Sequence, residues 1–198
     1  MGPQEISDRA FLTMNFILHN WLFLSVFQEA LSIFFVCVLQ LDEPHEWPPM
    51  YGNILEAYTV RRFWAHFWHR LVYAPYRAAA DKFSALFFGP ENRGTARRFA
   101  NVALVFLMSG AFHSILDWKN GMCSYWGSGV FYSVQTLGIV LESLVQLAWA
   151  PLRGRVFSSK LCSILERTLG YVWVFGWFFW IYPQRNFWEI NCYIRSNT

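Results

Sequence analysis

Four stretches of the chain are long and apolar enough to cross a lipid bilayer, which takes about 20 residues in a helix. They cover residues 16–41, 99–117, 129–150 and 169–182. Proline follows the last two stretches, so Pro151 and Pro183 are expected to mark the ends of those helices. The pattern predicts an all-α fold, in which about four transmembrane helices form a single membrane domain over residues 1–198.

Basic residues are distributed unevenly between the connections of this predicted bundle. Connections 42–98 and 151–168 together hold twelve Lys and Arg residues, whereas the rest of the chain holds four. Lys and Arg accumulate on the cytosolic side of membrane proteins, which places both connections in the cytosol and both termini on the opposite side. Five or more shorter crossings, or a helix that dips into the membrane within 42–98, are the alternatives.

Composition supports a membrane protein and excludes other classes. Hydrophobic residues make up 55% of the chain and charged residues only 15%, against about 25% charged residues in ordinary globular domains. The net charge is +3, and neither a long basic run nor a nucleic-acid motif is present, so no nucleic-acid partner is expected. The four cysteines have no CxxC or zinc-type spacing, and we expect neither a disulfide framework nor a metal site.

The most distinctive part of connection 42–98 follows a Pro-rich turn at residues 41–49. Between Thr59 and Tyr73, apolar and polar residues alternate at helical spacing. One face carries Phe63, Trp64, Phe67, Trp68, Leu71 and Val72, and the opposite face carries Arg62, His66, His69 and Tyr73. Such a pattern predicts an amphipathic helix that lies in the membrane interface.

A second signal, His113, lies inside the second apolar stretch. An ionisable side chain within a spanning helix is costly and usually faces a cavity or the bundle interior. A neutral imidazole there can take the proton of a hydroxyl and so generate a nucleophile. Ser109 allows another helix or a substrate to approach closely, and Asp117, four residues further on, lies on the face where it can orient the ring. The alternative is a histidine that only hydrogen-bonds to a neighbouring helix.

Other polar residues leave more than one interpretation open. His66 and His69 share a face, but no further ligand with suitable spacing joins them in a metal site. The arginines of connection 42–98 suit phosphates and lipid head groups equally well. Glu142 and Gln146 either line a polar path or bridge helices.

These residues resemble a known family. Phe63-Trp64-Ala65-His66-Phe67-Trp68-His69, after its Pro-rich turn, is similar to the Phe-Trp-x-x-x-Trp-His signature of wax-synthase-like proteins, which belong to the membrane-bound O-acyltransferase superfamily. Ser109-Gly110-x-x-His113 resembles the family's later Ser-Gly-x-x-His segment. The likeness covers about residues 44–185, and since family members are longer, it implies the C-terminal portion of a member, of fungal type.

The resemblance implies an acyltransferase that moves an acetyl or fatty acyl group from acyl-CoA to a lipophilic alcohol, such as a terpenoid specialised metabolite or a long-chain alcohol. Acyl-CoA is then a co-substrate, without a permanently bound cofactor, and the multi-pass protein resides in the endoplasmic reticulum membrane. The alternative is a non-catalytic or truncated relative that binds a lipid or a partner protein.

The resemblance also assigns roles. His113 is implied as the general base. The residues implied to support catalysis or to shape the acyl-CoA site are His69, Trp68, Trp64, Phe63, His66, Arg62, Ser109 and Asp117. A partner chain or an oligomer is expected to complete the wall of the substrate tunnel.

Overall fold

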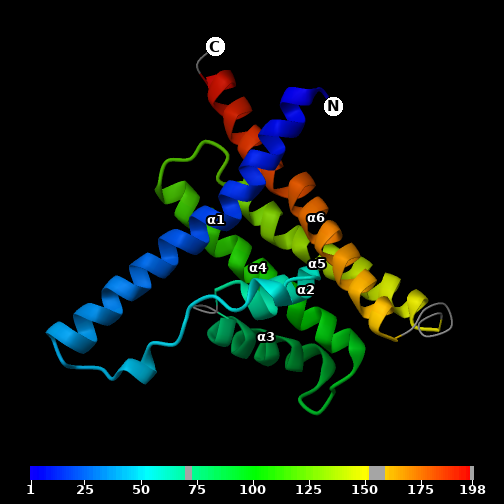
Figure 1. Ribbon diagram of the computed structural model, residues 1–198, viewed down its shortest axis with the longest axis horizontal. Helices are drawn as coiled ribbons and strands as arrows, with labels where there is room; N and C mark the ends of the chain where they lie inside the picture. Colours follow the sequence, from blue (N-terminus) through cyan, green and yellow to red (C-terminus); the bar gives the residue numbers. More distant parts are fainter. Residues whose placement is uncertain (70–72, 152–158, 197–198) are drawn as a thin grey trace.

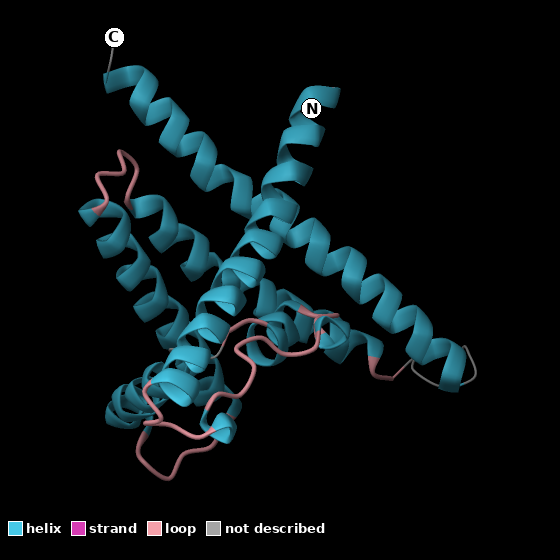
Figure 2. Ribbon diagram, turned by 60° about the vertical axis from the view of Figure 1, so that its left-hand side comes forward, coloured by secondary structure: helices cyan, strands magenta, loops and turns pink. Residues whose placement is uncertain are grey.

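The computed structural model describes residues 1–69, 73–151 and 159–196, and every regular element in these ranges is helical (Figure 2). In chain order the elements are α1 (Pro3–Ile33), the π-helix η1 (Phe34–Val38), the 3₁₀ helices η2 (Pro44–Glu46) and η3 (Ile54–Glu56), α2 (Val60–Arg62), the π-helix η4 (Phe63–Phe67), α3 (Tyr73–Phe88), α4 (Thr95–Lys119), α5 (Trp126–Trp149) and α6 (Ser159–Ser196). The prediction of an all-α fold is confirmed.

Among the described residues, three helical stretches have the length and apolar composition to cross a membrane. They are Pro3–Val38, Thr95–Lys119 and Trp126–Trp149, which correspond to the first three predicted crossings. The fold is therefore a membrane helical bundle. The fourth predicted crossing lies within α6, which is helical throughout but is not one of these three.

The expectation that Pro183 ends the last helix is wrong, because α6 continues beyond it to Ser196. Proline removes a backbone donor, but neighbouring helices in a membrane bundle can compensate by donating to nearby carbonyls. Thr13 Oγ1 on α1 donates to the carbonyl of Phe178 (3.4 Å), and Arg9 Nη1 donates to that of Trp180 (3.4 Å). These two carbonyls lie on either side of that of Phe179, which lacks the N–H donor that Pro183 cannot supply.

The helices are arranged around one crossing of α4 and α5. Figure 1 shows both termini at one end of the bundle, while α3 lies beside α4 at the other end. A Cβ atom on Gly110 would lie 2.9 Å from the carbonyl oxygen of Gly129, so only glycine allows this approach of α4 and α5. At this close approach the rings of His113 on α4 and Tyr132 on α5 are in contact.

The segment predicted as an amphipathic helix over 59–73 is shorter than expected. It begins as α2 and continues as the π-helix η4, in which the Trp68 N–H donates to the Phe63 carbonyl (2.8 Å). The backbone becomes extended at Trp68, and residues 70–72, with the predicted positions of Leu71 and Val72, lie outside the described residues. The wider turn of a π-helix breaks the 3.6-residue spacing on which the predicted faces depended.

The apolar face of this segment does not meet lipid, as an amphipathic interfacial helix would require. Phe63, Phe67 and Trp68 are only 1%, 3% and 5% exposed. Their rings pack inside the bundle: Phe63 lies 4.5 Å from Phe178 of α6, and Trp68 lies 4.9 Å from Phe16 of α1, between ring centroids. Each such aromatic pair contributes roughly 0.5–1.5 kcal/mol beyond its burial. The apolar face therefore forms the centre of the protein core.

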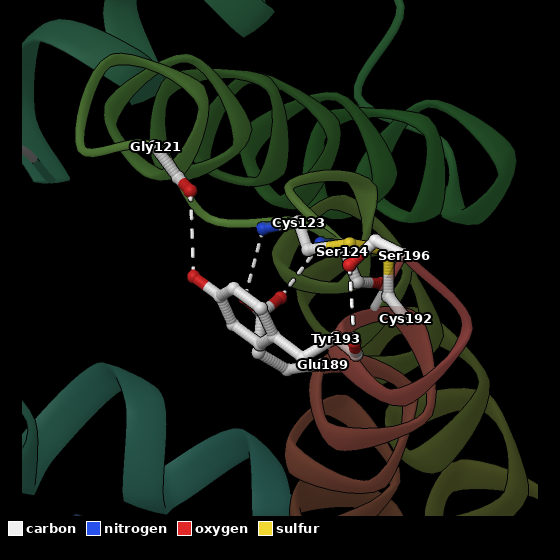
Figure 3. Close-up of a disulfide and its surroundings, with 7 residues drawn as sticks. All are labelled: Gly121, Cys123, Ser124, Glu189, Cys192, Tyr193 and Ser196. Carbon is white, nitrogen blue, oxygen red and sulfur yellow. Dashed lines mark hydrogen bonds between the residues drawn. A yellow bond between two sulfur atoms is a disulfide. The ribbon is translucent and has the colours of Figure 1, made fainter. Parts of the chain in front are cut away.

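A further correction concerns cysteine. Cys123, between α4 and α5, and Cys192, near the end of α6, form a disulfide, although no disulfide was expected (Figure 3). The two residues are 69 positions apart, and their Cα atoms lie 5.8 Å apart. Sequence spacing alone does not reveal such a pair, because only the antiparallel return of α6 brings the residues together. Cys37 and Cys162 are free.

Candidate active site

A cavity of about 600 Å³ opens between the 60–69 segment, α3, α4 and α5. Aromatic and imidazole side chains line it, among them Trp64, Trp68, His69, His113 and Tyr132. Arginines also line it, from the 60–69 segment, from α3 and from the region where α4 begins: Arg61, Arg77, Arg93, Arg97 and Arg98. The cavity thus combines two histidines and an aromatic wall with a group of cations.

His113 is half-buried on α4, and hydrogen bonds engage both ring nitrogens. Nδ1 lies 2.8 Å from the carbonyl oxygen of Ser109, and Nε2 lies 3.0 Å from the hydroxyl of Tyr132. Because a carbonyl only accepts, Nδ1 carries the proton and donates to Ser109. Nε2 therefore carries the lone pair and accepts from the Tyr132 hydroxyl. In this tautomer Nε2 is the nitrogen that can accept a proton, as a general base must.

Asp117 does not orient the His113 ring, contrary to the prediction. Its carboxylate accepts from Ser128 Oγ (2.6 Å) and from Arg185 Nη2 (2.9 and 3.0 Å), and Asp117 is buried. Asp117 therefore pairs with residues of α5 and α6, and not with His113, which lies four residues before it on α4. The ring of His113 is oriented instead by Ser109, through its backbone carbonyl, and by Tyr132.

His69 lines the same cavity as His113. Within the described part of the chain, its buried Nδ1 has no hydrogen-bond partner. Burial, together with a smaller contribution from the nearby His113 imidazole, lowers the pKa of His69 to about 4. The ring is therefore neutral at physiological pH. A buried polar atom without a protein partner is unusual, and beside a cavity it indicates a group available to a ligand.

Helix α5 holds the 60–69 segment in place through two polar side chains. The Glu142 carboxylate accepts from the backbone N–H groups of Val60 and Arg61, at the start of α2, and from Trp173 Nε1 (2.8 Å). Gln135 Oε1 accepts from Trp64 Nε1 at 3.2 Å and also from a tryptophan of α6, Trp177 Nε1, at 3.0 Å. Of the two interpretations of Glu142, helix bridging is the one that these contacts favour.

The structure brings together only part of the predicted site. His69, Trp68, Trp64, Ser109 and His113 all line the cavity. The other predicted residues lie elsewhere: Phe63 is in the core, Arg62 pairs with Glu56, His66 is exposed, and Asp117 pairs with Arg185. Within the described ranges, no three His, Cys, Asp or Glu side chains are grouped to hold a metal ion.

Tyr132 is the main residue that the sequence analysis missed. It shares one face of α5 with Ser128, Gln135 and Glu142. This stripe of polar side chains in a spanning helix is the signal that could have identified it.

The arginines at the cavity fall into two kinds. Arg97 is buried, and its guanidinium donates to Ser84 Oγ and to backbone carbonyls at 81, 89, 90 and 92, which fixes the connection from α3 to α4. Arg77, Arg93 and Arg98 are exposed around the same cavity. Arg97 is therefore structural, whereas the exposed cations are available to a charged ligand.

Fold and site together define a helical membrane protein with two histidines in an aromatic cavity that cations surround. Residues 47–134 match the model of the membrane bound O-acyl transferase family. The acetyltransferase ataH of Aspergillus terreus is 33% identical over 169 residues, which are 85% of this chain and 54% of the relative. The acetyltransferase aurG of Calcarisporium arbuscula is 33% identical over 162 residues, which are 81% of this chain and 38% of the relative.

A third relative, the acetyltransferase nanB of Aspergillus nanangensis, is 30% identical over 191 residues, which are 91% of this chain and 45% of the relative. No solved structure matches the chain. The chain belongs to the membrane bound O-acyl transferase family. It spans about half the length, or less, of these curated relatives.

Proposed function

We propose that the protein transfers an acyl group from acyl-CoA to the hydroxyl of a lipophilic alcohol, with His113 as the general base. The observation that carries this proposal is the tautomer of His113, whose Nε2 lone pair belongs to a ring that lines the cavity. Nε2 takes the hydroxyl proton while the oxygen attacks the thioester carbonyl carbon. The C–S bond then breaks, and the CoA thiolate takes the proton from the imidazolium.

The exposed arginines support CoA as the carrier of the acyl group. CoA bears several phosphates, and guanidinium groups bind phosphate with charge-assisted, often bidentate hydrogen bonds. Arg77, Arg93 and Arg98 surround the cavity that His113 lines, so a donor held at its phosphates can direct its thioester toward the base. The relatives are named acetyltransferases, which supports acetyl as the transferred group.

The aromatic lining supports a lipophilic acceptor. Trp64, Trp68 and Phe106 offer apolar surface to a terpenoid or a long-chain alcohol, and a membrane protein meets such compounds in the bilayer. The chain spans about half of its relatives' length or less. We therefore propose that a partner chain, a second copy or a further segment forms the rest of the wall of the substrate tunnel.

We place the protein in the endoplasmic reticulum membrane, with the cavity opening toward the cytosol. The basic connection 42–98 favours the cytosol for the cavity end, where acyl-CoA is available. The Cys123–Cys192 disulfide supports an oxidising compartment, such as the lumen, for the end with both termini. Two independent features thus favour the same orientation.

The test compares wild type, His113→Ala and His66→Ala in microsomes from a host without the activity. Acetyl-CoA and palmitoyl-CoA are offered with a panel of terpenoid and fatty alcohols, and ester formation is measured by mass spectrometry. We expect His113→Ala to lose about 10²–10⁴-fold in rate at normal protein level. His66→Ala makes the same change at an exposed histidine outside the cavity and should keep the wild-type rate. An active His113→Ala variant would exclude the proposed role.

A further inference from the structure

Tyr132 is the closest polar neighbour of the proposed base. Its hydroxyl lies 3.0 Å from His113 Nε2, and the two rings lie 4.2 Å apart with a tilt of 30°. Tyr132 is only 8% exposed, yet it lines the cavity. The glycine crossing of α4 and α5 fixes both rings on helix backbones, so the contact does not depend on a loop.

The position of this hydroxyl is not explained by packing. Its ring already contacts Phe131 and Trp64, which a phenylalanine would do equally well. The hydroxyl instead occupies the Nε2 lone pair, which the acceptor alcohol needs during proton transfer. When the alcohol takes that lone pair, the phenol must give its hydrogen bond to another acceptor close by, because a buried donor without a partner is costly.

We propose that Tyr132 is a catalytic residue that donates a hydrogen bond to the oxyanion of the tetrahedral intermediate; this inference rests on the proposed acyl transfer. The attacking oxygen hydrogen-bonds to Nε2, and in the intermediate the oxyanion is only two covalent bonds from that oxygen. A hydroxyl that already reaches Nε2 is therefore within reach of the oxyanion. Trp64, another donor of the cavity wall, gives its Nε1–H to Gln135.

The steps balance in protons and electrons. His113 Nε2 removes the proton of the alcohol, a C–O bond forms, and the carbonyl electron pair moves to the oxygen, where the Tyr132 O–H stabilises it without transferring its proton. The pair then returns, the C–S bond breaks, and the thiolate takes the proton from the His113 imidazolium. Tyr132 returns to Nε2 when the ester leaves, which restores the arrangement in the structure.

The test uses Tyr132→Phe, which keeps the ring and removes only the hydroxyl. We expect kcat to fall by about 10²–10³-fold, the usual loss for one oxyanion donor, with the KM for acetyl-CoA unchanged. The matched control is Tyr182→Phe, which removes a hydroxyl from a half-buried ring that stacks 4.3 Å from Phe16, outside the cavity lining. Its kcat should stay within twofold of wild type.

The outcomes separate this inference from the proposed function. Protein level and elution of the detergent-solubilised variant must match wild type, and a Phe at this site preserves the packing. If His113→Ala is inactive but Tyr132→Phe is active, the proposed acyl transfer stands and the proposed role of Tyr132 is overturned. A faster Tyr132→Phe variant also overturns it, since the phenol would then only compete with the alcohol for Nε2. Equal rates for wild type and His113→Ala overturn both proposals.

Discussion

Two polar clusters lie next to each other on α4, and they use their residues in opposite ways. His113 faces the cavity, whereas Asp117, four residues later, is closed in an ion pair with Arg185. Around Asp117 the end with both termini is reinforced further: the Glu189 carboxylate accepts from two backbone N–H groups beside the disulfide (Figure 3). Among the described residues both clusters keep a buried nitrogen without a partner, Arg185 Nε and His69 Nδ1, but only His69 lines the cavity.

The difference teaches how to separate structural from functional polar groups in such a bundle. A paired, covalently reinforced charge cluster resists opening, because a broken pair would leave a charge in an apolar environment. A cavity with exposed cations and an unpaired imidazole is instead prepared for a ligand. Changes in the first cluster should therefore lower stability and leave the kcat of the folded protein intact, whereas changes at the cavity should affect turnover.

The largest effect is expected from Arg185→Met. It leaves the Asp117 carboxylate buried without its cation, which costs about 3–5 kcal/mol of stability. The midpoint of thermal unfolding in detergent, followed by tryptophan fluorescence, should fall accordingly. Adding Asp117→Asn removes the unpaired charge and should recover most of the stability that Arg185→Met loses. If the double variant is no more stable than Arg185→Met, the Asp117–Arg185 ion pair is not what stabilises this end of the bundle.

A smaller loss is expected from opening the disulfide. Replacing Cys123 and Cys192 with serine frees a 69-residue loop and should cost about 2–4 kcal/mol. Reductant should lower the unfolding midpoint of the wild type by the same amount and leave the double-serine variant unchanged. The kcat of the protein that remains folded should equal wild type. A selective loss of kcat would contradict the separation of this end from the cavity.

Sequence reasoning succeeded where local pattern decides the structure. Three of the four predicted crossings follow from hydropathy, and the cost of an ionisable group in an apolar stretch correctly predicts that His113 faces a cavity. It failed on the 60–69 segment, because an amphipathic face looks the same whether it meets lipid or protein. It also failed for Asp117, whose partner Arg185 is 68 residues away and depends on how α6 folds back.

Helix α5 shows a signal that the sequence does contain. Ser128, Tyr132, Gln135 and Glu142 lie at helical spacing on one face; the first two contact α4, and the last two contact the 60–69 segment. A stripe of polar residues in a spanning helix predicts contacts toward the bundle interior. Only the structure assigns the partners, because these depend on the positions of the neighbouring helices.

At the cavity, Gln135→Leu tests how the 60–69 segment is positioned. The change leaves the indole N–H groups of Trp64 and Trp177 without their common acceptor, which costs about 1–3 kcal/mol. Because Trp64 lines the cavity, kcat should fall along with stability, unlike in the disulfide variant. Gln146→Leu makes the same change at an exposed position of α5 and serves as the control. A loss of stability with unchanged kcat would place Gln135 with the purely structural groups.

The smallest effect is expected from Arg98→Ala, which removes one exposed cation beside the cavity. A single exposed charge contact contributes little in water, so the KM for acetyl-CoA should rise only about two- to fivefold, with kcat unchanged. Higher salt should reduce the difference from wild type, because it screens exposed charges. Lys119→Ala removes an exposed cation from the other end of α4 and should leave KM unchanged. Equal KM values for the two variants would mean that the cations around the cavity do not hold the donor, and the contrast between the two ends would then rest on the histidines alone.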